Sequence, residues 1–376
     1  MGLPDAAALR AVEAGSALAA TIAMVSMYFF IAARCILALG EAGNFPAAIK
    51  VTAEYFPKKD RAYATSIFNA GASIGALFAP LTIPLLAKAW GWEMAFIVIG
   101  ALGFVWMGFW VFMYKKPSDH PKVNAAELEY IEQDQHEVVD GETVGKEQEG
   151  EKISFWRTLS FKQTWAFAFG KFMTDGVWWF FLFWAPAYFS DQFGYATYTP
   201  MGQALIFTLY FIVTLLSIGG GYLPKLFVDK RGMDPYAGRM RAMLIFAFVP
   251  ILALLAQPLG IYSAWWPAII IGLAGAAHQA WSANLYSTIG DMFPTSTVAS
   301  IVGIGTMAGG ISSYIINQGA GLLFVYAADA GDSFNFMSFS GKPAGYMIVF
   351  SICAISYLVA WLVIKALVPR YKKIEI

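Results

Sequence analysis

Residues 34–46 read RCILALGEAGNFP and place two ionisable side chains inside an otherwise apolar run. Arg34 and Glu41 are seven residues apart, which is about two turns of an α-helix, so both side chains lie on one face. A charge at membrane depth costs roughly 2.5–3.5 kcal/mol on insertion scales, so such residues normally face a partner or a watery cavity. The pair is therefore a candidate substrate or proton site. A structural ion pair between packed helices is the alternative.

The composition around this stretch is that of a polytopic membrane protein. Of the 376 residues, 58% are hydrophobic and 13% are charged, whereas a soluble domain carries about 25% charged residues. The formal net charge is zero, which gives no indication of nucleic acid binding. The three histidines and two cysteines form no metal-ligand pattern, and the sequence has no phosphate loop, nucleophile elbow or zincin motif. We expect no metal, no cofactor and no enzymatic activity.

Nine apolar runs are long enough to cross a bilayer as helices, which takes about 20 residues each. The expected fold is all-α and integral to the membrane. The predicted spans lie near residues 26–52, 63–88, 92–114, 165–190, 201–223, 240–258, 263–289, 297–325 and 344–368.

The basic residues outside these runs predict the orientation, because cytoplasmic loops are rich in Lys and Arg. Of the 25 basic residues, 18 lie on one predicted side, in the loops after the first, third and fifth spans and in the tail after the ninth. The loops on the opposite side are poor in them. We therefore expect this basic side, including the C-terminus, to be cytoplasmic.

The segment 115–162 divides the chain. It holds 11 of the 25 acidic residues, which indicates a solvated cytoplasmic linker, and Asn124 is placed to cap a short helix over residues 124–138. Around it we expect an N-terminal remnant (1–25), an incomplete N-terminal helical bundle (26–114), and a C-terminal six-helix bundle with a cytoplasmic tail (163–376). An odd number of spans places the N-terminus outside without an export signal, so we expect upstream spans to be missing.

Four stretches resemble the major facilitator superfamily, and within it the anion:cation symporters that carry hexuronates and other sugar acids. They are residues 34–46 with 55–57 and 60–61, residues 68–75 with Pro80, residues 171–186, and residues 277–284 with 291–294, similar to the family's fourth, fifth, seventh and tenth helices. Family members have twelve spans, so the resemblance implies a major-facilitator-type bundle that lacks the first three. A bacterial inner membrane is the implied location. The substrate-binding arginine of the family's first helix has no counterpart here.

The charged pair of the first span suits the binding of an anion together with a proton. Arg34 supplies a cation that cannot deprotonate. Burial and a nearby arginine act in opposite directions on the protonation of Glu41, so a change of environment between transport states would couple a proton to the substrate. Asn44 follows one turn later, where it can support the Glu41 carboxylate or bind a substrate hydroxyl.

Residues of later spans complete the predicted substrate site. An indole face packs well on a sugar ring, which makes Trp178 and Trp179 candidates, with a membrane-interface belt as the alternative. His278 suits a proton relay or simple packing. The remaining polar candidates for substrate binding are Asn69, Ser73, Gln279, Asn284 and Thr306.

Two other patterns predict contacts within the bundle. Lys171 and Asp175 are four residues apart and can form an ion pair, either a local pair near the membrane interface or a gating pair. Gly71 and Gly75 have the spacing of a helix-packing pair. The run Gly219–Gly221 and the pair Gly309–Gly310 indicate bends or close contacts.

Together these features predict a proton-coupled secondary transporter that takes up a small organic anion. The resemblance implies a hexuronate or related sugar acid as substrate, protons as the coupling ion, the lipid bilayer as surroundings and a monomeric state. Rocking of two halves about the site would give alternating access. The alternative is a truncated, non-transporting membrane fragment, scaffold or sensor.

Overall fold

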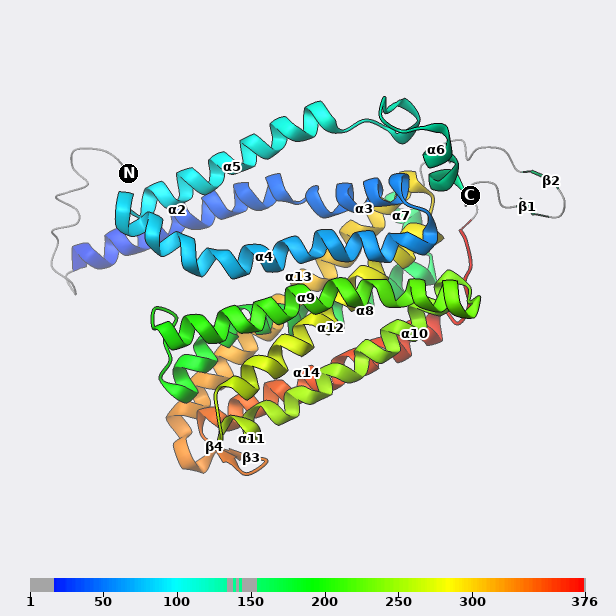
Figure 1. Ribbon diagram of the computed structural model, residues 1–376. Coiled ribbons are helices and arrows are strands. Elements are labelled where there is room, and N and C mark those ends of the chain that lie inside the picture. Colours follow the sequence, from blue (N-terminus) through cyan, green and yellow to red (C-terminus); the bar gives the residue numbers. More distant parts are fainter. Residues whose placement is uncertain (1–16, 134–137, 140–141, 144–153, 375–376) are drawn as a thin grey trace. The chain divides into compact units, whose positions relative to one another are not determined.

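The structure is a computed structural model, and its described residues are 17–133, 138–139, 142–143 and 154–374. It consists of long helices and two small hairpins (Figure 1). The α-helices are α2 (Ala17–Glu41), α3 (Asn44–Tyr55), α4 (Lys58–Trp90), α5 (Trp92–Met113), α6 (Ala125–Glu132), α7 (Phe155–Thr158), α8 (Lys162–Phe193), α9 (Pro200–Arg231), α10 (Pro235–Phe248), α11 (Ala256–Gly260), α12 (Trp265–Met292), α13 (Thr295–Ala330) and α14 (Lys342–Leu367). The 3-10 helices are η1 (Pro117–Asp119), η2 (Val249–Leu255) and η3 (Gly331–Ser333), and the strands are β1 (Val138–Val139), β2 (Glu142–Thr143), β3 (Asn335–Phe336) and β4 (Phe339–Ser340).

The chain divides into two compact units, Met1–Ala48 and Ile49–Ile376, and each is described by itself. In the first unit the predicted span 26–52 is interrupted, because Ala42 and Gly43 form a turn between α2 and α3. Gly43 favours such a break, and Pro46 is tolerated in the first turn of α3, where its missing N–H is not needed. The predicted remnant 1–25 overlaps α2 from Ala17 onwards, and the rest of it lies outside the described residues.

Local sequence explains where several helices of the second unit begin and end. The Asn124 side chain accepts a hydrogen bond from the backbone N–H of Glu127 at 2.8 Å, which confirms the predicted cap of α6. The predicted extent of that helix is wrong, because α6 ends at Glu132 and residue 138 lies in a strand. Helices α8 and α9 end at Gly194 and Gly232, whose φ angles of +71° and +60° suit glycine at a helix C-terminus.

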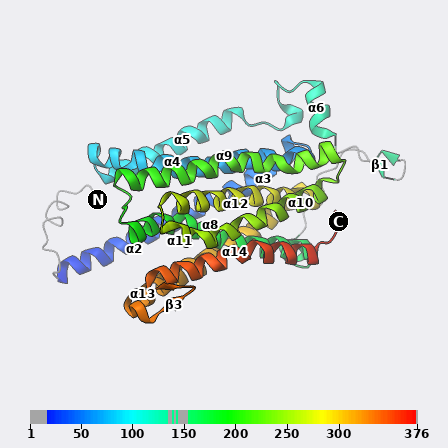
Figure 2. The same ribbon diagram turned by 60° about the horizontal axis from the view of Figure 1, so that its bottom comes forward.

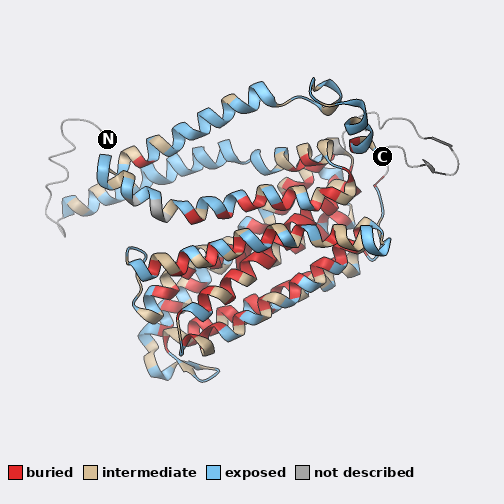
Figure 3. Cartoon of the chain, in the orientation of Figure 1, coloured by how far each residue is buried: buried red, intermediate tan, exposed pale blue. Residues whose placement is uncertain are grey.

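The second unit is built around α8, α9 and α12. Helix α9 packs along both α4 and α12, while α8 packs along α13 and α14 (Figures 1 and 2). Figure 3 shows that burial concentrates on α8, α10, α12 and α14, whereas α5 is almost entirely exposed. Nearly every residue of α12 from Pro267 onwards is buried, so this helix is the central element of the unit.

Close helix contacts occur at some of the predicted glycines and not at others. A Cβ built on Gly220 of α9 would lie 2.5 Å from the Cβ of Ala280 on α12, and Gly221 meets α4 in the same way. The predicted close contacts are thus confirmed for these two residues. The packing predicted for Gly71 and Gly75 stays a prediction, since among the described residues no atom beyond the neighbouring backbone of α4 lies within 4 Å of a Cβ built at either position.

Six helical segments of the described chain are long and apolar enough to cross a membrane: Ala17–Tyr55, Trp92–Met113, Pro200–Arg231, Pro235–Gly260, Ser296–Ser333 and Lys342–Leu367. They confirm the prediction of a multi-pass helical membrane protein, while the count of nine spans and their orientation stay predictions. Helices α4, α8 and α12 overlap three further predicted spans but are more polar. They contain Asn69, Lys171 and His278, which are buried in the unit.

Candidate functional site

The charged pair of the first unit lies on a single helix. Arg34 and Glu41 are both in α2, where no residue is buried, and Asn44 begins α3. All three side chains are exposed, and within the described residues no ion pair joins Arg34 to Glu41. Their spacing keeps both charged groups on one face of α2. Their predicted roles in binding and proton coupling stay predictions.

A polar seam runs between α4 and α12 in the second unit. At one end Arg61 donates to the Oδ1 atom of Asp291 at 2.8 Å. One turn further along both helices, the hydroxyls of Thr65 and Ser287 are 3.4 Å apart. From the first contact to the second, the residue number rises by four on α4 and falls by four on α12, so the two helices are antiparallel. One further step of four residues places Asn69 of α4 at the level of residues 283–284 of α12.

The deeper part of this seam contains polar atoms that lack partners. Asn69 and Ser73 are buried on α4, and among the described residues neither the amide of Asn69 nor the hydroxyl of Ser73 has a hydrogen-bond partner. On α12, the side-chain nitrogen of Asn284 donates to the backbone carbonyl of Ala280 at 2.7 Å. The side-chain oxygen Oδ1 of Asn284 has no hydrogen-bond partner among the described residues. Each such group costs roughly 1–3 kcal/mol when buried, so they mark a place where a polar ligand or water is favoured.

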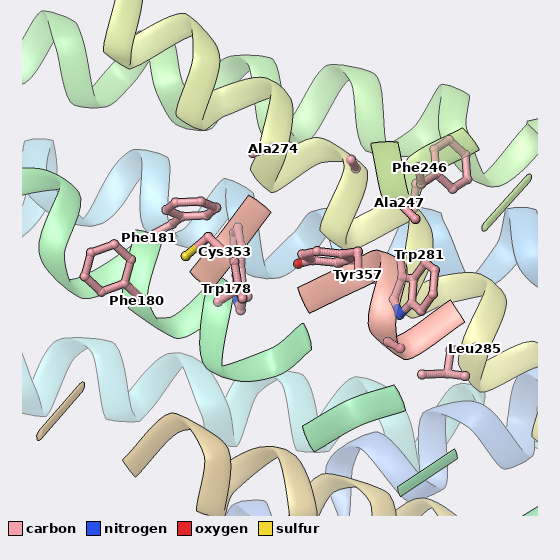
Figure 4. Close-up of a cluster of buried hydrophobic side chains, with 14 of the residues drawn as sticks. Trp178, Phe180, Phe181, Phe246, Ala247, Ala274, Trp281, Leu285, Cys353 and Tyr357 are labelled. Carbon is pink, nitrogen blue, oxygen red and sulfur yellow. The ribbon is translucent and has the colours of Figure 1, made fainter. Parts of the chain in front are cut away.

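Trp178 and His278 are the two predicted site residues that the structure brings into direct contact. The indole of Trp178 on α8 stacks on the imidazole of His278, with ring centroids 5.4 Å apart and planes 3° from parallel. Nδ1 of His278 is 2.8 Å from the hydroxyl of Tyr357 on α14, so the imidazole is already hydrogen-bonded. Figure 4 shows Trp178, Tyr357 and Trp281 from three different helices in one buried cluster.

The other predicted residues of the second unit lie apart from this contact. Trp179 is 36% exposed and stacks on Phe183 of its own helix, so it lies on a different face of α8 from Trp178. Thr306 is half-buried on α13, and its hydroxyl donates to the carbonyl of Val302 at 3.0 Å. Gln279 is buried on α12.

The predicted ion pair between Lys171 and Asp175 is confirmed, while its two possible roles, a local pair near the membrane interface or a gating pair, stay predictions. The Nζ–Oδ2 distance is 2.7 Å, and both residues are buried. The ammonium lies 4.5 Å from the centre of the Tyr286 ring. Oδ1 of Asp175 is buried without a hydrogen-bond partner among the described residues.

A buried cluster of charges at the other end of α12 was missed by sequence reasoning. Asp291 pairs with Arg61 and also with Arg239 of α10, and Arg239 in turn donates to the carbonyl of Lys58. Its sequence position assigns Arg239 to a cytoplasmic loop, yet the residue is only 2% exposed. The one available signal was Asp291 at the end of an apolar run, because such a carboxylate needs a partner.

A second ionic contact ties α4 to α9 and to the start of the linker. Asp60 accepts from Lys225 at 2.5 Å and from the hydroxyl of Tyr130 on α6 at 2.6 Å. The hydrogen bond to Asp60 raises the pKa of Tyr130 above its usual value. Together with Asp291, this aspartate joins α4 to α9, α10 and α12.

One cavity lies apart from the predicted substrate-site residues and next to the Asp291 cluster, where the hydroxyl of Tyr371 donates to the backbone carbonyl of Asp291 at 3.0 Å. It has a volume of about 950 Å³ and is lined by residues 160–163 and 367–374, where the start of α8 meets the tail after α14. Because it contains none of the predicted site residues, we do not assign the substrate site to it.

Long apolar helices packed around buried polar side chains define a multi-pass helical membrane protein. The chain belongs to the Major Facilitator Superfamily, whose sequence model matches residues 9–317. This confirms the family predicted from the four sequence stretches.

Several curated proteins are similar to the chain over much of its length. It is 29% identical over 348 residues to the "Hexuronate transporter" of Escherichia coli (strain K12), covering 92% of this chain and 73% of that protein. It is 33% identical over 198 residues to the "Galacturonate transporter" of Dickeya chrysanthemi, covering 52% of this chain and 54% of that protein. It is 34% identical over 217 residues to the "Probable galactarate/D-glucarate transporter GarP" of Escherichia coli (strain K12), covering 56% of this chain and 47% of that protein. These names confirm a transport protein rather than an enzyme.

Proposed function

We propose that the chain takes up a small organic anion, a hexuronate or related sugar acid, together with protons across a bacterial inner membrane. The names of its relatives support the substrate class. The proposed site rests on three buried residues of α4 and α12, Asn69, Ser73 and Asn284, whose side chains carry polar atoms without a hydrogen-bond partner among the described residues. A sugar acid offers several hydroxyl groups that can donate to and accept from such atoms.

The charged groups of the first unit would bind the anion and the proton. Arg34 has a planar guanidinium that can grip a carboxylate through two parallel hydrogen bonds. Glu41 lies on the same face of α2 and would bind the coupling proton, with Asn44 as a supporting polar group.

Trp178 and Trp179 have different roles in the proposed substrate site. Trp178 is buried and one face of its indole is covered by His278, so a sugar ring would stack on the opposite face only after a rearrangement of the helices. His278 would position that indole through its bond to Tyr357, and Gln279 would bind a hydroxyl. Trp179 and Thr306 would take part only after a rearrangement, because both now contact their own helices.

A binding assay on the solubilised chain tests the site. We expect labelled D-galacturonate to bind and to be displaced by D-glucuronate. Substitution N69A should weaken binding about tenfold, since one or two hydrogen bonds to a polar ligand are lost. The matched control is N335A, which removes an exposed asparagine outside α4 and α12. Equal affinities for N69A and the unsubstituted chain would contradict the assignment.

The expected membrane orientation has its own test. We propose a cytoplasmic C-terminus from the asymmetry of the basic residues. A C-terminal reporter that is active only outside the cytoplasm should stay inactive. Activity of this reporter would contradict the proposed orientation.

A further inference from the structure

Lys171 and Asp175 form an ion pair, the α8 ion pair, that the proposed site does not use. Their side chains are only 5% and 11% exposed, and Nζ lies 2.7 Å from Oδ2. The spacing of four residues places them on successive turns of one helix face. Each charge depends on the other here, because a desolvated ion that loses its partner is strongly disfavoured.

The carboxylate of this pair is only half satisfied. Oδ2 of Asp175 contacts the ammonium, whereas Oδ1 is buried and no described group donates to it. Helix α13 comes so close that a Cβ built on Gly309 would overlap Oδ2 of Asp175. Because no other group donates a hydrogen bond to this buried oxygen Oδ1, a proton can bind there without displacing an existing hydrogen bond.

Groups from three other helices lie near the α8 ion pair. From α12, Tyr286 lies against the ammonium, and His278 is hydrogen-bonded to Tyr357. From α14, the hydroxyl of Tyr357 lies 3.4 Å from the backbone carbonyl oxygen of Thr174, the residue before Asp175. From α13, Gly309 and Ser312 pack against this stretch of α8, and neither titrates. Among the described residues, Lys171 is the one cation that forms an ion pair with the carboxylate.

We propose that the α8 ion pair is a proton-coupled carboxylate site, at which the carboxylate of a sugar acid replaces Asp175 as the partner of Lys171. The proposal rests on the proposed function, since it supplies a second charged site for the same substrate class. Lysine suits the exchange because its ammonium is a compact charge on a flexible four-carbon stem and can follow either partner.

The proton balance of this exchange follows from the charges. Before binding, the ammonium and Asp175 neutralise each other. The substrate carboxylate adds one negative charge, and a proton from water that binds to an oxygen of Asp175 keeps the buried site neutral. When the anion leaves, Asp175 returns this proton to water and pairs with Lys171 again. Binding of the anion and of the proton are thereby linked at about one proton per anion.

The same exchange would distinguish a sugar acid from its uncharged parent. D-galacturonate and D-galactose differ in the carboxylate that replaces one hydroxymethyl group. Only the acid can take the place of Asp175, since an uncharged sugar would leave the ammonium with the carboxylate it already has. We therefore expect proton uptake with D-galacturonate and none with D-galactose.

The test measures protons taken up when D-galacturonate binds to the solubilised full chain in weak buffer with a pH indicator. The unsubstituted chain should take up about one proton more per bound anion than D175N, which keeps the shape of the side chain but cannot accept a proton. D175E should retain the uptake. Substitution D191N is the matched control, because it alters a more exposed ion pair with Lys342 and should leave the uptake unchanged.

A second pair of variants tests the lysine. K171Q alone leaves a buried carboxylate unpaired, so the double variant K171Q/D175N, which removes both charges, guards against loss of folding. Both should bind D-galacturonate at least tenfold more weakly. Proton uptake by D175N equal to that of the unsubstituted chain, or undiminished binding by the double variant, would overturn the proposal. Absence of any D-galacturonate binding by the unsubstituted chain would contradict the proposed function itself, and this inference with it.

Discussion

Replacing Asp291 by asparagine should destabilise the second unit more than any single change to an exposed charge. The carboxylate pairs with Arg61 at 2.8 Å and with Arg239 through its other oxygen, and the three side chains are between 2% and 14% exposed. Removing one partner of a buried ion pair costs about 3–5 kcal/mol. Asparagine keeps one acceptor oxygen, so we expect about 3 kcal/mol, which is a change of roughly a hundredfold in the unfolding equilibrium.

The assay is unfolding of the purified chain in mixed micelles by increasing detergent denaturant, followed by tryptophan fluorescence. Substitution D229N is the matched control, because Asp229 is exposed on α9 and its loss should change stability by less than about 0.5 kcal/mol. A loss below about 1 kcal/mol for D291N would refute the reasoning, since it would place the cluster among exposed ion pairs.

Three further predictions concern charge and packing. Arg34→Ala should abolish anion uptake. Arg34→Lys should abolish most of it, because lysine lacks the planar guanidinium that binds a carboxylate through two hydrogen bonds. Near-normal affinity of the lysine variant in uptake assays would contradict this bidentate binding. Glu41→Gln should keep substrate counterflow in loaded proteoliposomes but lose proton-driven accumulation, whereas loss of both would indicate a purely structural carboxylate. Gly309→Ala should cost about 1–3 kcal/mol in the same unfolding assay, because its Cβ would overlap the Asp175 carboxylate. Gly310→Ala should not destabilise, because among the described residues no atom beyond the neighbouring backbone of α13 lies within 4 Å of its Cβ.

The helices were predictable from sequence because a span is set by a local property. Runs of about 20 apolar residues must satisfy their backbone hydrogen bonds internally in a bilayer, which permits a helix without knowledge of its neighbours. The Lys171–Asp175 pair was predictable for the same reason, since four residues on a helix fix the contact. The turn at Ala42 and Gly43 was not predicted, because Gly43 and Pro46 favour a break there but glycine and proline are also tolerated inside membrane-spanning helices.

Contacts between residues that are distant in the sequence could not be predicted from the sequence alone. Arg239 meets Asp291 from 52 residues away, and nothing in its loop-like position indicates burial. The stacking of Trp178 on His278 likewise depends on how α8 packs against α12. The sequence analysis singled out Trp178 and His278 separately, but it could not predict that their rings stack on each other.

The most direct test of proton-coupled sugar-acid transport is accumulation of labelled D-galacturonate in proteoliposomes that contain this chain. With an acidic exterior, we predict uptake above the external concentration, abolished by a protonophore and competed by D-glucuronate but not by D-galactose. Absence of uptake, or accumulation that persists after the proton gradient is collapsed, would contradict the account.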